Sequence, residues 1–433
     1  MKISVILFFL IIINLSAQEF TNWQNYSAKE NIRDVIYDNG YLWAATDGGA
    51  FGYNSVTGEF RQLTKSEGLS SQNLTSVTSD ESGKIWFGTS EGIINIYNPV
   101  NGTVAKILDI YNTEKTQKSI NDLFHKNDTI YVAMDFGLSL IDANSLFFLE
   151  TVRKFGDFTT EIEVKSVSKK SRISISTSEG IAVSKSGISN FSAPGNWISL
   201  NNSNLPDASE VSAIIEDNDG NYVIASNNGV QSLSFANNTL SYSGIDFYAG
   251  TGLIDVQFFP SVSEIEYFAL SKARLFLNDH TAAGSINSGD FTSFCQTATG
   301  DFYIGSTNGL YDLTNDSLIT PNSPAGNTFN GIGVDESGGV WVGSGSGAAS
   351  EGIYYFDGTT WLNYNTANVP QIRSNRFYEI YISESNEIYA SNWGEGFTRI
   401  FENDFETIYT GNSPMQGILN DPNFLVVTGM QKD

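Results

Sequence analysis

The chain has 433 residues and a formal net charge of −25 at pH 7, with 48 acidic against 23 basic side chains. This charge argues against non-specific nucleic-acid binding, because phosphates repel an acidic surface. A single cysteine excludes an intrachain disulfide framework, and only two histidines leave little material for a zinc site.

Residues 1–17 are predicted to be a secretory signal peptide. Lys2 precedes an apolar stretch from Ile3 to Ile13, and Leu15-Ser16-Ala17 forms a small-residue cleavage site. The stretch is shorter than the ~20 residues that a membrane span needs, so a membrane anchor is only the alternative. No lipoprotein cysteine follows and no other segment is apolar enough to span a membrane. We therefore expect an exported, soluble mature chain in the periplasm or at the outer-membrane surface.

A short phrase then returns about every 43 residues, and its best copy runs from Asp80 to Ile93. Aligned on the last glycine, the copies are spaced by 43, 45, 43, 49, 80, 43 and 44 residues, and the interval of 80 contains a degenerate copy near residues 267–273. The aligned glycines are Gly49, Gly92, Gly137, Gly180, Gly229, Gly309, Gly352 and Gly396. A strand-rich repeat of ~40–45 residues is typical of a β-propeller.

Each copy of the phrase predicts strands of one propeller blade. Residues 85–87 form an apolar run, which indicates a strand buried on both faces. Residues 80–83 predict a hairpin, because Asp and Ser bond to the local backbone and Gly accepts a positive φ. With the flanking runs 74–78 and 93–97, each unit supplies about four strands.

An aromatic residue precedes the aligned glycine by six residues in most copies. Its members are Trp43, Trp86, Tyr131 and Tyr303, with Trp341 and Tyr389 after short insertions, whereas Ser174 and Val223 are exceptions. One aromatic per blade in an apolar strand is interpreted as packing, not as a sugar-binding column. Irregular aromatics are better binding candidates, although core positions are commoner for them too: Trp393, Trp197 and Trp361.

The other chemically interesting residues favour structural roles. His125 and His280 are both expected in solvated turns, and Cys295 is expected to be buried in a strand over residues 291–295. The segment Asp217–Asn221 alternates oxygen ligands but lacks the glycine and terminal glutamate of an EF-hand, so a hairpin is favoured. We therefore predict no catalytic residues, no metal site and no cofactor, and the ligand-binding residues stay unknown.

The repeat predicts an all-β fold of four-stranded blades. The 416 residues after the signal peptide correspond to about 9.7 units, whereas propellers close at 4–8 blades. We predict one seven-bladed propeller over residues 18–320 and a truncated second propeller over residues 321–433. A strand from Phe20–Tyr26 is expected to close the first ring. Residues 418–428 resemble the opening of another unit, so we expect a fragment or a prematurely ended gene product.

Two family resemblances are carried by these motifs. The phrase Glu67–Leu74, followed by residues 80 and 85–89, resembles the two-component regulator propeller repeat of Bacteroidetes. More narrowly, residues 20–160 resemble the N-terminal propeller of the PorZ family of type IX secretion components. That resemblance is carried in order by Trp23, Phe51–Asn54, Glu67–Ser70, Ser119–Leu123, Asp135–Leu138, Glu150–Val152 and Gly156.

The PorZ resemblance implies two seven-bladed propellers followed by a C-terminal β-sandwich sorting domain. It also implies a non-catalytic role, the presentation of anionic lipopolysaccharide to the sortase that attaches cargo to the cell surface. Two alternatives stay open. The chain could be the oligosaccharide-sensing ectodomain of a signalling protein, or an enzyme such as a polysaccharide lyase, for which the scarcity of His, Lys and Arg is unfavourable.

Overall fold

The computed structural model describes residues 24–205, 208–258, 267–277, 282–283, 289–345, 347, 350–393, 395–402 and 404–408. The predicted signal peptide, Trp23, His280 and residues 418–428 lie outside the described residues. The described part contains nine antiparallel sheets, each of four strands that are consecutive in sequence. The predicted all-β fold of four-stranded blades is therefore confirmed, and we number the sheets as blades 1 to 9.

Blades 1 to 3 consist of β1 (Ile32–Asp38), β2 (Tyr41–Thr46), β3 (Gly49–Asn54), β4 (Phe60–Leu63); β5 (Leu74–Ser79), β6 (Ile85–Thr89), β7 (Ile94–Asn98), β8 (Thr103–Ile107); and β9 (Ile120–Lys126), β10 (Thr129–Met134), β11 (Gly137–Asp142), β12 (Phe148–Val152). Blades 4 to 6 consist of β13 (Val164–Lys169), β14 (Ile173–Thr177), β15 (Gly180–Ser184), β16 (Trp197–Asn201); β17 (Val211–Glu216), β18 (Tyr222–Ser226), β19 (Gly229–Ala236), β20 (Thr239–Phe247); and β21 (Leu253–Gln257), β22 (Phe268–Ser271), β23 (Leu275–Leu277), β24 (Ala282–Ala283).

Blades 7 to 9 consist of β25 (Phe291–Gln296), β26 (Phe302–Ser306), β27 (Gly309–Asp312), β28 (Ser317–Ile319); β29 (Ile332–Val334), β30 (Val340–Gly343), β31 (Ile353–Phe356), β32 (Trp361–Tyr364); and β33 (Phe377–Ile382), β34 (Ile388–Asn392), β35 (Gly396–Phe401), β36 (Asp404–Ile408). Two short 3-10 helices, η1 (Pro194–Asn196) and η2 (Asn202–Asn204), flank β16.

The blades stack face to face, which is why their second strands have no wet face. Every residue of β6 is buried, and the rings of Trp43 and Trp86 are at most 1% exposed. Tyr131, Tyr303 and Trp341 are buried as well. The interpretation of the aromatic column as packing is thus confirmed at these positions, where each ring fills the space between neighbouring sheets.

Six of the eight aligned glycines begin the third strand of their blades, and Gly92 and Gly352 lie just before it, for a steric reason. Gly49 has a φ of +113°, and a Cβ atom at this position would lie 2.4 Å from the carbonyl oxygen of Leu63. At Gly137, with a φ of +138°, the corresponding distance to the carbonyl oxygen of Val152 is 2.1 Å. Only glycine adopts this conformation while letting the end of the fourth strand come so close.

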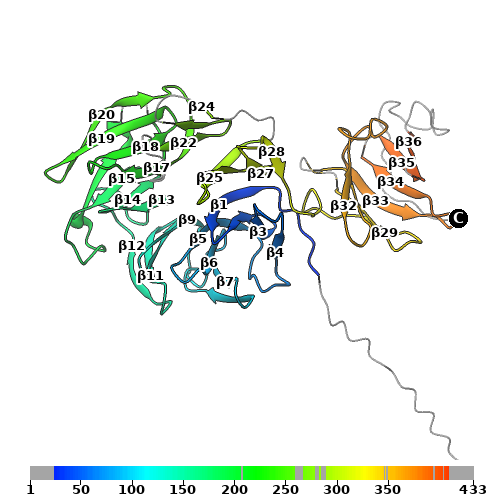
Figure 1. Ribbon diagram of the computed structural model, residues 1–433, viewed down its shortest axis with the longest axis horizontal. Helices are drawn as coiled ribbons and strands as arrows, with labels where there is room; N and C mark the ends of the chain where they lie inside the picture. The colour runs from blue at the N-terminus through cyan, green and yellow to red at the C-terminus, as the bar shows by residue number, and fades with distance from the viewer. Residues whose placement is uncertain are drawn as a thin grey trace, which may run out of the picture.

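The first seven blades form a closed ring (Figure 1). Their innermost strands β1, β5, β9, β13, β17, β21 and β25 pack against one another in chain order, and β25 also packs against β1. One buried cluster joins the two ends, since Ile32 and Val35 of blade 1 pack with Cys295 and Tyr303 of blade 7.

The predicted closing strand from Phe20–Tyr26 is wrong for its described part. Residues 24–26 form no strand, and the seventh sheet consists of β25 to β28 alone. Closure therefore relies on side-chain packing between blades 1 and 7. Burial of large apolar side chains is strong enough for this, at about 25 cal/mol per Å² of buried apolar surface.

Blades 8 and 9 form a second body beside the ring, reached through residues 320–331 (Figure 1). They pack against each other through β29, β30 and β33. The division of the chain at residues 320 and 321 into two independently folding propeller domains stays a prediction.

Candidate functional site

A cavity of about 850 Å³ forms the central channel of the ring and is lined by all seven innermost strands. Each of these strands has a β-bulge near its start. The bulged residues all line the channel, and they are Arg33, Thr75, Asn121, Lys165, Ser212, Ile254 and Thr292. Because the bulge recurs in every blade, it aligns equivalent channel positions around the ring.

Three aspartates follow the bulges of blades 1, 3 and 6 and form what we term the carboxylate collar: Asp34, Asp122 and Asp255. Asp34 accepts a hydrogen bond of 2.8 Å from the backbone N–H of Val77, and Asp122 accepts one of 2.8 Å from Val167. Each bond joins one innermost strand to the next. Since innermost strands are sheet edges, their amide groups would otherwise lack a protein partner.

The collar holds its protons more tightly than ordinary carboxyl groups. Burial raises the pKa of Asp122 to about 7 and that of Asp255 to about 6, and the pKa of Asp34 is raised well above its usual range. The negative charges of Asp122 and Asp255 add to the effect of burial on Asp34. Near neutral pH the collar is therefore only partly ionised, and the middle of the channel carries less negative charge than three aspartates suggest.

The rim of the channel is formed where the innermost strands end and the hairpins begin. Near the ends of the innermost strands, the channel-lining side chains of the seven blades are, in order, Tyr37, Ser79, His125, Lys169, Glu216, Phe258 and Gln296. Lys126 and Lys170 line the channel as well. The hairpin residue that follows is Asp38, Asp80, Lys126, Lys170 and Asp217 in blades 1 to 5, and Thr297 in blade 7. His125 is thus not in a turn, as predicted, but is the penultimate residue of β9 and lines the channel.

Lys170 of blade 4 reaches across the rim to blades 5 and 6. The Lys170 ammonium donates hydrogen bonds of 2.8 Å to the carbonyl oxygen of Asp217 and to Asn218 Oδ1 of blade 5, and it lies 5.0 Å from the ring centroid of Phe258 in blade 6. Burial lowers the pKa of Lys169, and the positive charges of Arg172 and Lys126 lower it further, against an opposite effect of Glu216. The cations of blades 3 and 4 are therefore close enough to repel each other.

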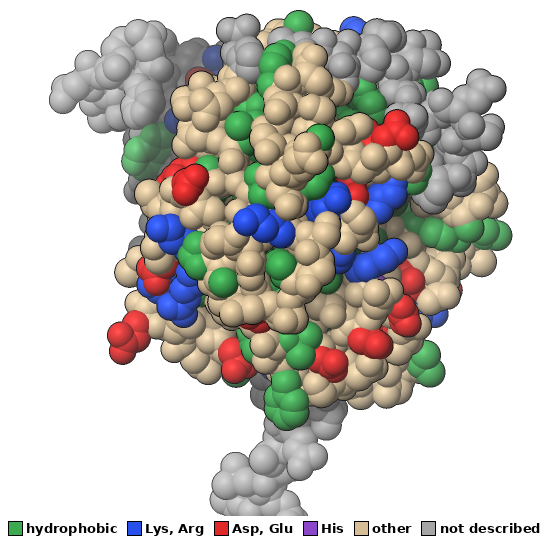
Figure 2. All heavy atoms as spheres, turned by 90° about the vertical axis from the view of Figure 1, so that its left-hand side faces the viewer, with side chains coloured by type: hydrophobic (Ala, Val, Ile, Leu, Met, Phe, Trp, Pro, Cys, Tyr) green, Lys and Arg blue, Asp and Glu red, His purple; other side chains and the backbone are tan. Residues whose placement is uncertain are grey.

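The ring carries its charge unevenly. Eleven of the 23 Lys and Arg residues fall between Lys106 and Lys185, where eleven Asp and Glu residues balance them. This stretch of blades 2 to 4 is neutral overall, in a chain of net charge −25. On the side of the molecule shown in Figure 2, Lys and Arg side chains form a band across the middle of the face. An acidic ligand would meet the least repulsion here.

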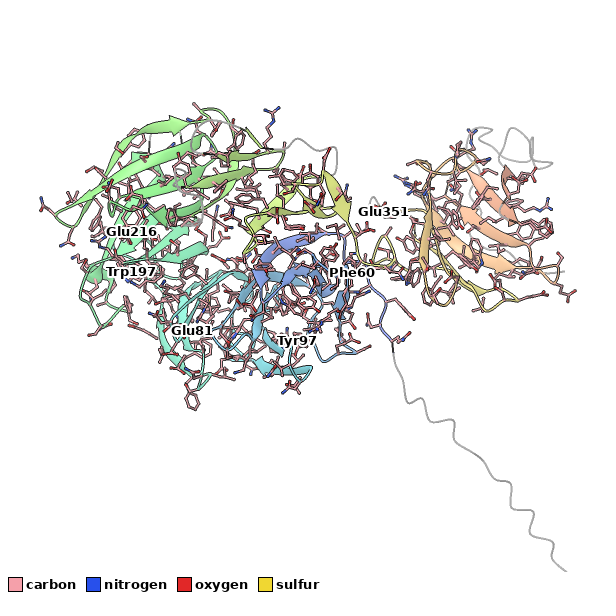
Figure 3. The ribbon with its side chains drawn as sticks, viewed as in Figure 1. Phe60, Glu81, Tyr97, Trp197, Glu216 and Glu351 are labelled. Carbon is pink, nitrogen blue, oxygen red and sulfur yellow. The ribbon has the colours of Figure 1, made fainter. Side chains whose placement is uncertain are left out.

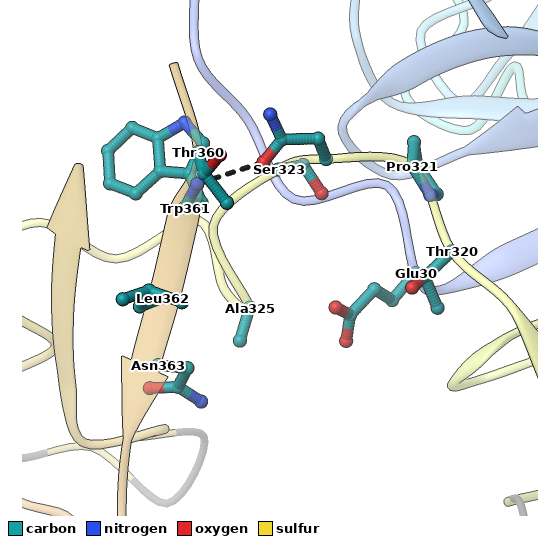
Figure 4. Close-up of a pocket in the computed structure, with 10 residues that line it drawn as sticks. Glu30, Thr320, Pro321, Ser323, Ala325, Thr360, Trp361, Leu362 and Asn363 are labelled. Carbon is teal, nitrogen blue, oxygen red and sulfur yellow. Dashed lines mark hydrogen bonds between the residues drawn. The ribbon is translucent and has the colours of Figure 1, made fainter. Parts of the chain in front are cut away.

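A second, smaller cavity of about 410 Å³ lies between the ring and the second body. Glu30 faces it from one side and Asn363 of β32 from the other (Figure 4). Burial raises the pKa of Glu30 to about 7, assisted by the charge of Glu351, which Figure 3 shows on the second body. This cavity contains no basic side chain, so it does not suit an acidic ligand.

The aromatic candidates from the sequence do not gather into one site. Trp197 is buried against Phe155, and Trp361 packs on Tyr26 and Phe356 at the junction of the two bodies. Trp393 is 39% exposed and lies beside Tyr378 in blade 9. No residue of blade 9 lines the channel.

The remaining sequence predictions concern buried and turn residues. Cys295 is buried in β25 as predicted, and burial raises the pKa of its thiol. The segment Asp217–Asn221 is a hairpin as favoured, with Asp217 Oδ1 accepting the backbone N–H groups of Asp219 and Asn221. Among the described residues no three His, Cys, Asp or Glu side chains form a group that could bind a metal ion.

The rim residues were missed by the sequence analysis. Their signal is present in the repeat, because alignment on the hairpin shows Asp38, Asp80 and Asp217 at the position where blades 3 and 4 have Lys126 and Lys170. The alignment alone does not show that these hairpin residues lie around a channel.

Comparison with known proteins supports the predicted resemblance. Residues 42–198 match the family model of the N-terminal β-propeller domain of PorZ, of the type IX secretion system. No curated protein matches the sequence. The part of the chain that the structure describes contains no helix able to cross a membrane.

Solved structures share the fold at low sequence identity. PorZ of Porphyromonas gingivalis, an essential surface component of its type IX secretion system, superposes with a TM-score of 0.73 at 17% identity, over 93% of this chain and 55% of that chain. The extracellular domain of the putative hybrid two-component system BT3049 of B. thetaiotaomicron gives 0.52 at 14% identity, over 88% and 53%. The chain thus spans about half the length of both proteins.

Proposed function

We propose that this chain is an exported, non-catalytic recognition propeller of the PorZ kind, acting in type IX secretion by presenting anionic lipopolysaccharide to the sortase. The observation that carries this proposal is the match of residues 42–198 to the PorZ propeller family. Its place of action would be the periplasm or the outer-membrane surface, and its protein partners would be other components of the secretion system, including the sortase.

The electrostatics of the channel support an acidic ligand. The chain as a whole repels anions, yet the channel rim presents Lys126, Lys169 and Lys170 from two adjacent blades. Positive side chains grouped at the mouth of a concave site raise the local concentration of negatively charged ligands. The partly protonated carboxylate collar reduces the opposing charge beneath the rim.

Binding to lipopolysaccharide tests the proposal. The purified chain would be titrated with lipopolysaccharide from the source bacterium and, in parallel, with neutral plant and algal oligosaccharides. Saturable binding to lipopolysaccharide alone is expected. Binding to a free oligosaccharide and not to lipopolysaccharide would overturn the proposal in favour of a sensor.

The second candidate is the ligand-sensing ectodomain of a signalling protein. It is favoured by the shared fold with the BT3049 extracellular domain. The complete gene distinguishes the two, because a membrane span followed by a kinase domain would support the sensor, whereas a terminal β-sandwich sorting domain would support the secretion component.

A further inference from the structure

The basic residues of the rim stand at a position where the repeat otherwise places an acid. In blades 1, 2 and 5 the first hairpin residue is Asp38, Asp80 and Asp217, and blade 8 has Asp335. Blades 3 and 4, which are neighbours in the ring, have Lys126 and Lys170. The residues just before these lysines, His125 and Lys169, also line the channel. We call these four side chains the cationic rim.

Among the described residues, no carboxylate forms an ion pair with Lys126, Lys169 or Lys170, although the charge of Glu216 acts on Lys169. Among the described residues, Lys126 has no hydrogen-bond acceptor and no carboxylate partner, and its side chain is exposed. The Lys169 ammonium donates only to the backbone carbonyl of Ser171. Lys126 and Lys169 come from adjacent blades and line the same channel, so two ammonium groups without an ion pair face one mouth of the channel.

The nearest acidic side chains at the rim are already occupied. Glu216 is buried, accepts the backbone N–H groups of Ser171 and Arg172 at 3.0 and 3.1 Å, and lies 3.4 Å from the Arg172 guanidinium. Asp217 Oδ1 accepts two backbone N–H groups of its own hairpin. Glu216 still attracts Lys169 electrostatically, but neither carboxylate forms an ion pair with Lys126 or Lys169.

The opposite mouth of the channel lacks this arrangement. Lys165, its bulged lysine in blade 4, pairs with Glu210 at 2.5 Å. This leaves Arg33 as the one lining cation there without an ion pair among the described residues. The carboxylate collar lies between the two mouths, and its residual negative charge opposes the passage of an anion from the rim into the channel.

We propose that the cationic rim binds a phosphate group of the ligand, held mainly between Lys126 and Lys169 at the mouth of the channel. Lysine ammonium groups bind phosphate as mobile point charges, and hydrogen bonds between charged partners are the strong ones. His125 lines the same edge, and Lys170 is held in place by blade 5. The inference rests on the proposed function only for the identity of the molecule that carries the phosphate.

Isothermal titration of the purified chain with glucose 1-phosphate, and with glucose as the neutral match, tests the site. Glucose 1-phosphate should bind in the millimolar range or tighter, and glucose should not. Lys126→Gln and Lys169→Gln should each weaken binding about tenfold and the double variant about 100-fold, the usual strength of hydrogen bonds between charged groups. Lys126→Arg, which keeps the charge, should retain binding.

The matched control is the double variant Lys65→Gln, Lys106→Gln, which removes the same charge from exposed positions away from the rim. An equal loss of affinity in this control would overturn the site, because the effect would then be one of net charge. Absence of glucose 1-phosphate binding at millimolar concentrations, or unchanged binding in Lys126→Gln, Lys169→Gln, would overturn it as well.

Lipopolysaccharide binding by the same variants separates this inference from the proposed function. Loss of binding to both lipopolysaccharide and glucose 1-phosphate in Lys126→Gln, Lys169→Gln supports the rim as the contact for a lipopolysaccharide phosphate. Failure of the unaltered chain to bind lipopolysaccharide, with glucose 1-phosphate binding intact, supports the phosphate site and contradicts the proposed function alone.

Discussion

Blades 2 and 3 are built from the same repeat, yet their hairpins carry residues of opposite charge at the same position. In blade 2, Asp80 Oδ2 accepts the indole N–H of Trp86 at 2.8 Å, and Asp80 Oδ1 accepts the backbone N–H groups of Ser82 and Lys84. In blade 3, Lys126 stands at the same place, and the aromatic of the next strand is Tyr131.

In blades 2 and 8 the hairpin aspartate and the tryptophan of the next strand are linked for a physical reason. A buried indole N–H needs an acceptor, and the hairpin aspartate supplies it in blade 2 and again in blade 8, where Asp335 accepts from Trp341 at 2.9 Å. Blade 4 has Ser174 in the aromatic position and Lys170 in the hairpin. Without the tryptophan the hairpin residue need not accept an indole N–H. Blades 3 and 4 have a lysine there, whereas blade 5, with Val223 in the aromatic position, keeps Asp217.

Among the changes that this comparison suggests, replacement of the buried tryptophan should have the largest effect on stability. Trp86→Ala should lower the free energy of unfolding by about 3–5 kcal/mol, because the ring is fully buried and its removal leaves a cavity. Urea denaturation followed by circular dichroism measures the change. A variant with unaltered stability but abolished ligand binding would show that the aromatic column is a binding feature.

Removal of the hairpin carboxylate should cost less. Asp80→Ala is expected to lower the free energy of unfolding by about 1–3 kcal/mol at pH 7, since the buried indole N–H loses its acceptor. Lys126→Ala is the matched change in blade 3 and should stay within about 0.5 kcal/mol. Equal costs for the two variants would contradict the difference that we draw between the blades.

The Asp80 variant also has an expected pH dependence. Burial by itself raises the pKa of Asp80, but hydrogen bonds from Ser82, Trp86 and Lys84 outweigh it and lower the pKa below the usual value. A lowered pKa stabilises the fold at pH values above the unfolded-state pKa, and this contribution is lost as pH falls through the folded-state value. The stability gap between Asp80→Ala and the unaltered chain should therefore narrow in acid, as denaturation at several pH values would show.

The carboxylate collar should respond in the opposite direction. The pKa of Asp122 is raised to about 7, so folding favours the protonated form and stability falls as pH rises from about 4 to 7. Asp122→Asn keeps an oxygen that can accept from Val167 and removes the charge. It should raise stability at pH 8 by about 1–3 kcal/mol, within the ~1.4 kcal/mol per pKa unit that linkage allows, and flatten the pH profile. Lower stability at pH 8 would contradict a raised pKa.

The smallest effect is expected from removing the second body. A chain ending at residue 320 should unfold cooperatively at nearly the same temperature as the full chain, because β25 packs directly against β1. Differential scanning calorimetry of both chains measures this. Failure of the shorter chain to fold would contradict the predicted boundary and would show that contacts such as Asn327 Oδ1 with the Ala28 backbone N–H are needed by the ring.

Much of the fold follows from the sequence because the repeat is local. Each unit carries its own hairpin signal, its buried strand and the glycine that begins the third strand, as in Gly49 and Gly137. These features depend on residues a few positions apart, so they can be recognised in the sequence without knowledge of the neighbouring blades. The resemblance to the PorZ propeller, confirmed over residues 42–198, depends on the same local phrases.

The closure of the ring and the site within it depend on contacts between distant residues. Cys295 packs with Val35, and Lys170 reaches Phe258, across separations that no repeat encodes. The sequence predicts a turn at His125 because the polar residues Lys, Asn and Asp follow it. In the structure, β9 continues through Lys126.

The sequence by itself determined the strands, the turns and the period, because backbone conformation and burial within a blade depend on neighbours along the chain. Only the tertiary structure decided how the ring closes, that Asp34, Asp122 and Asp255 share its channel, and that His125, Lys126, Lys169 and Lys170 lie at its rim. The physical reason is that electrostatic and packing interactions depend on distance in space, and the ring brings together side chains that lie far apart in sequence.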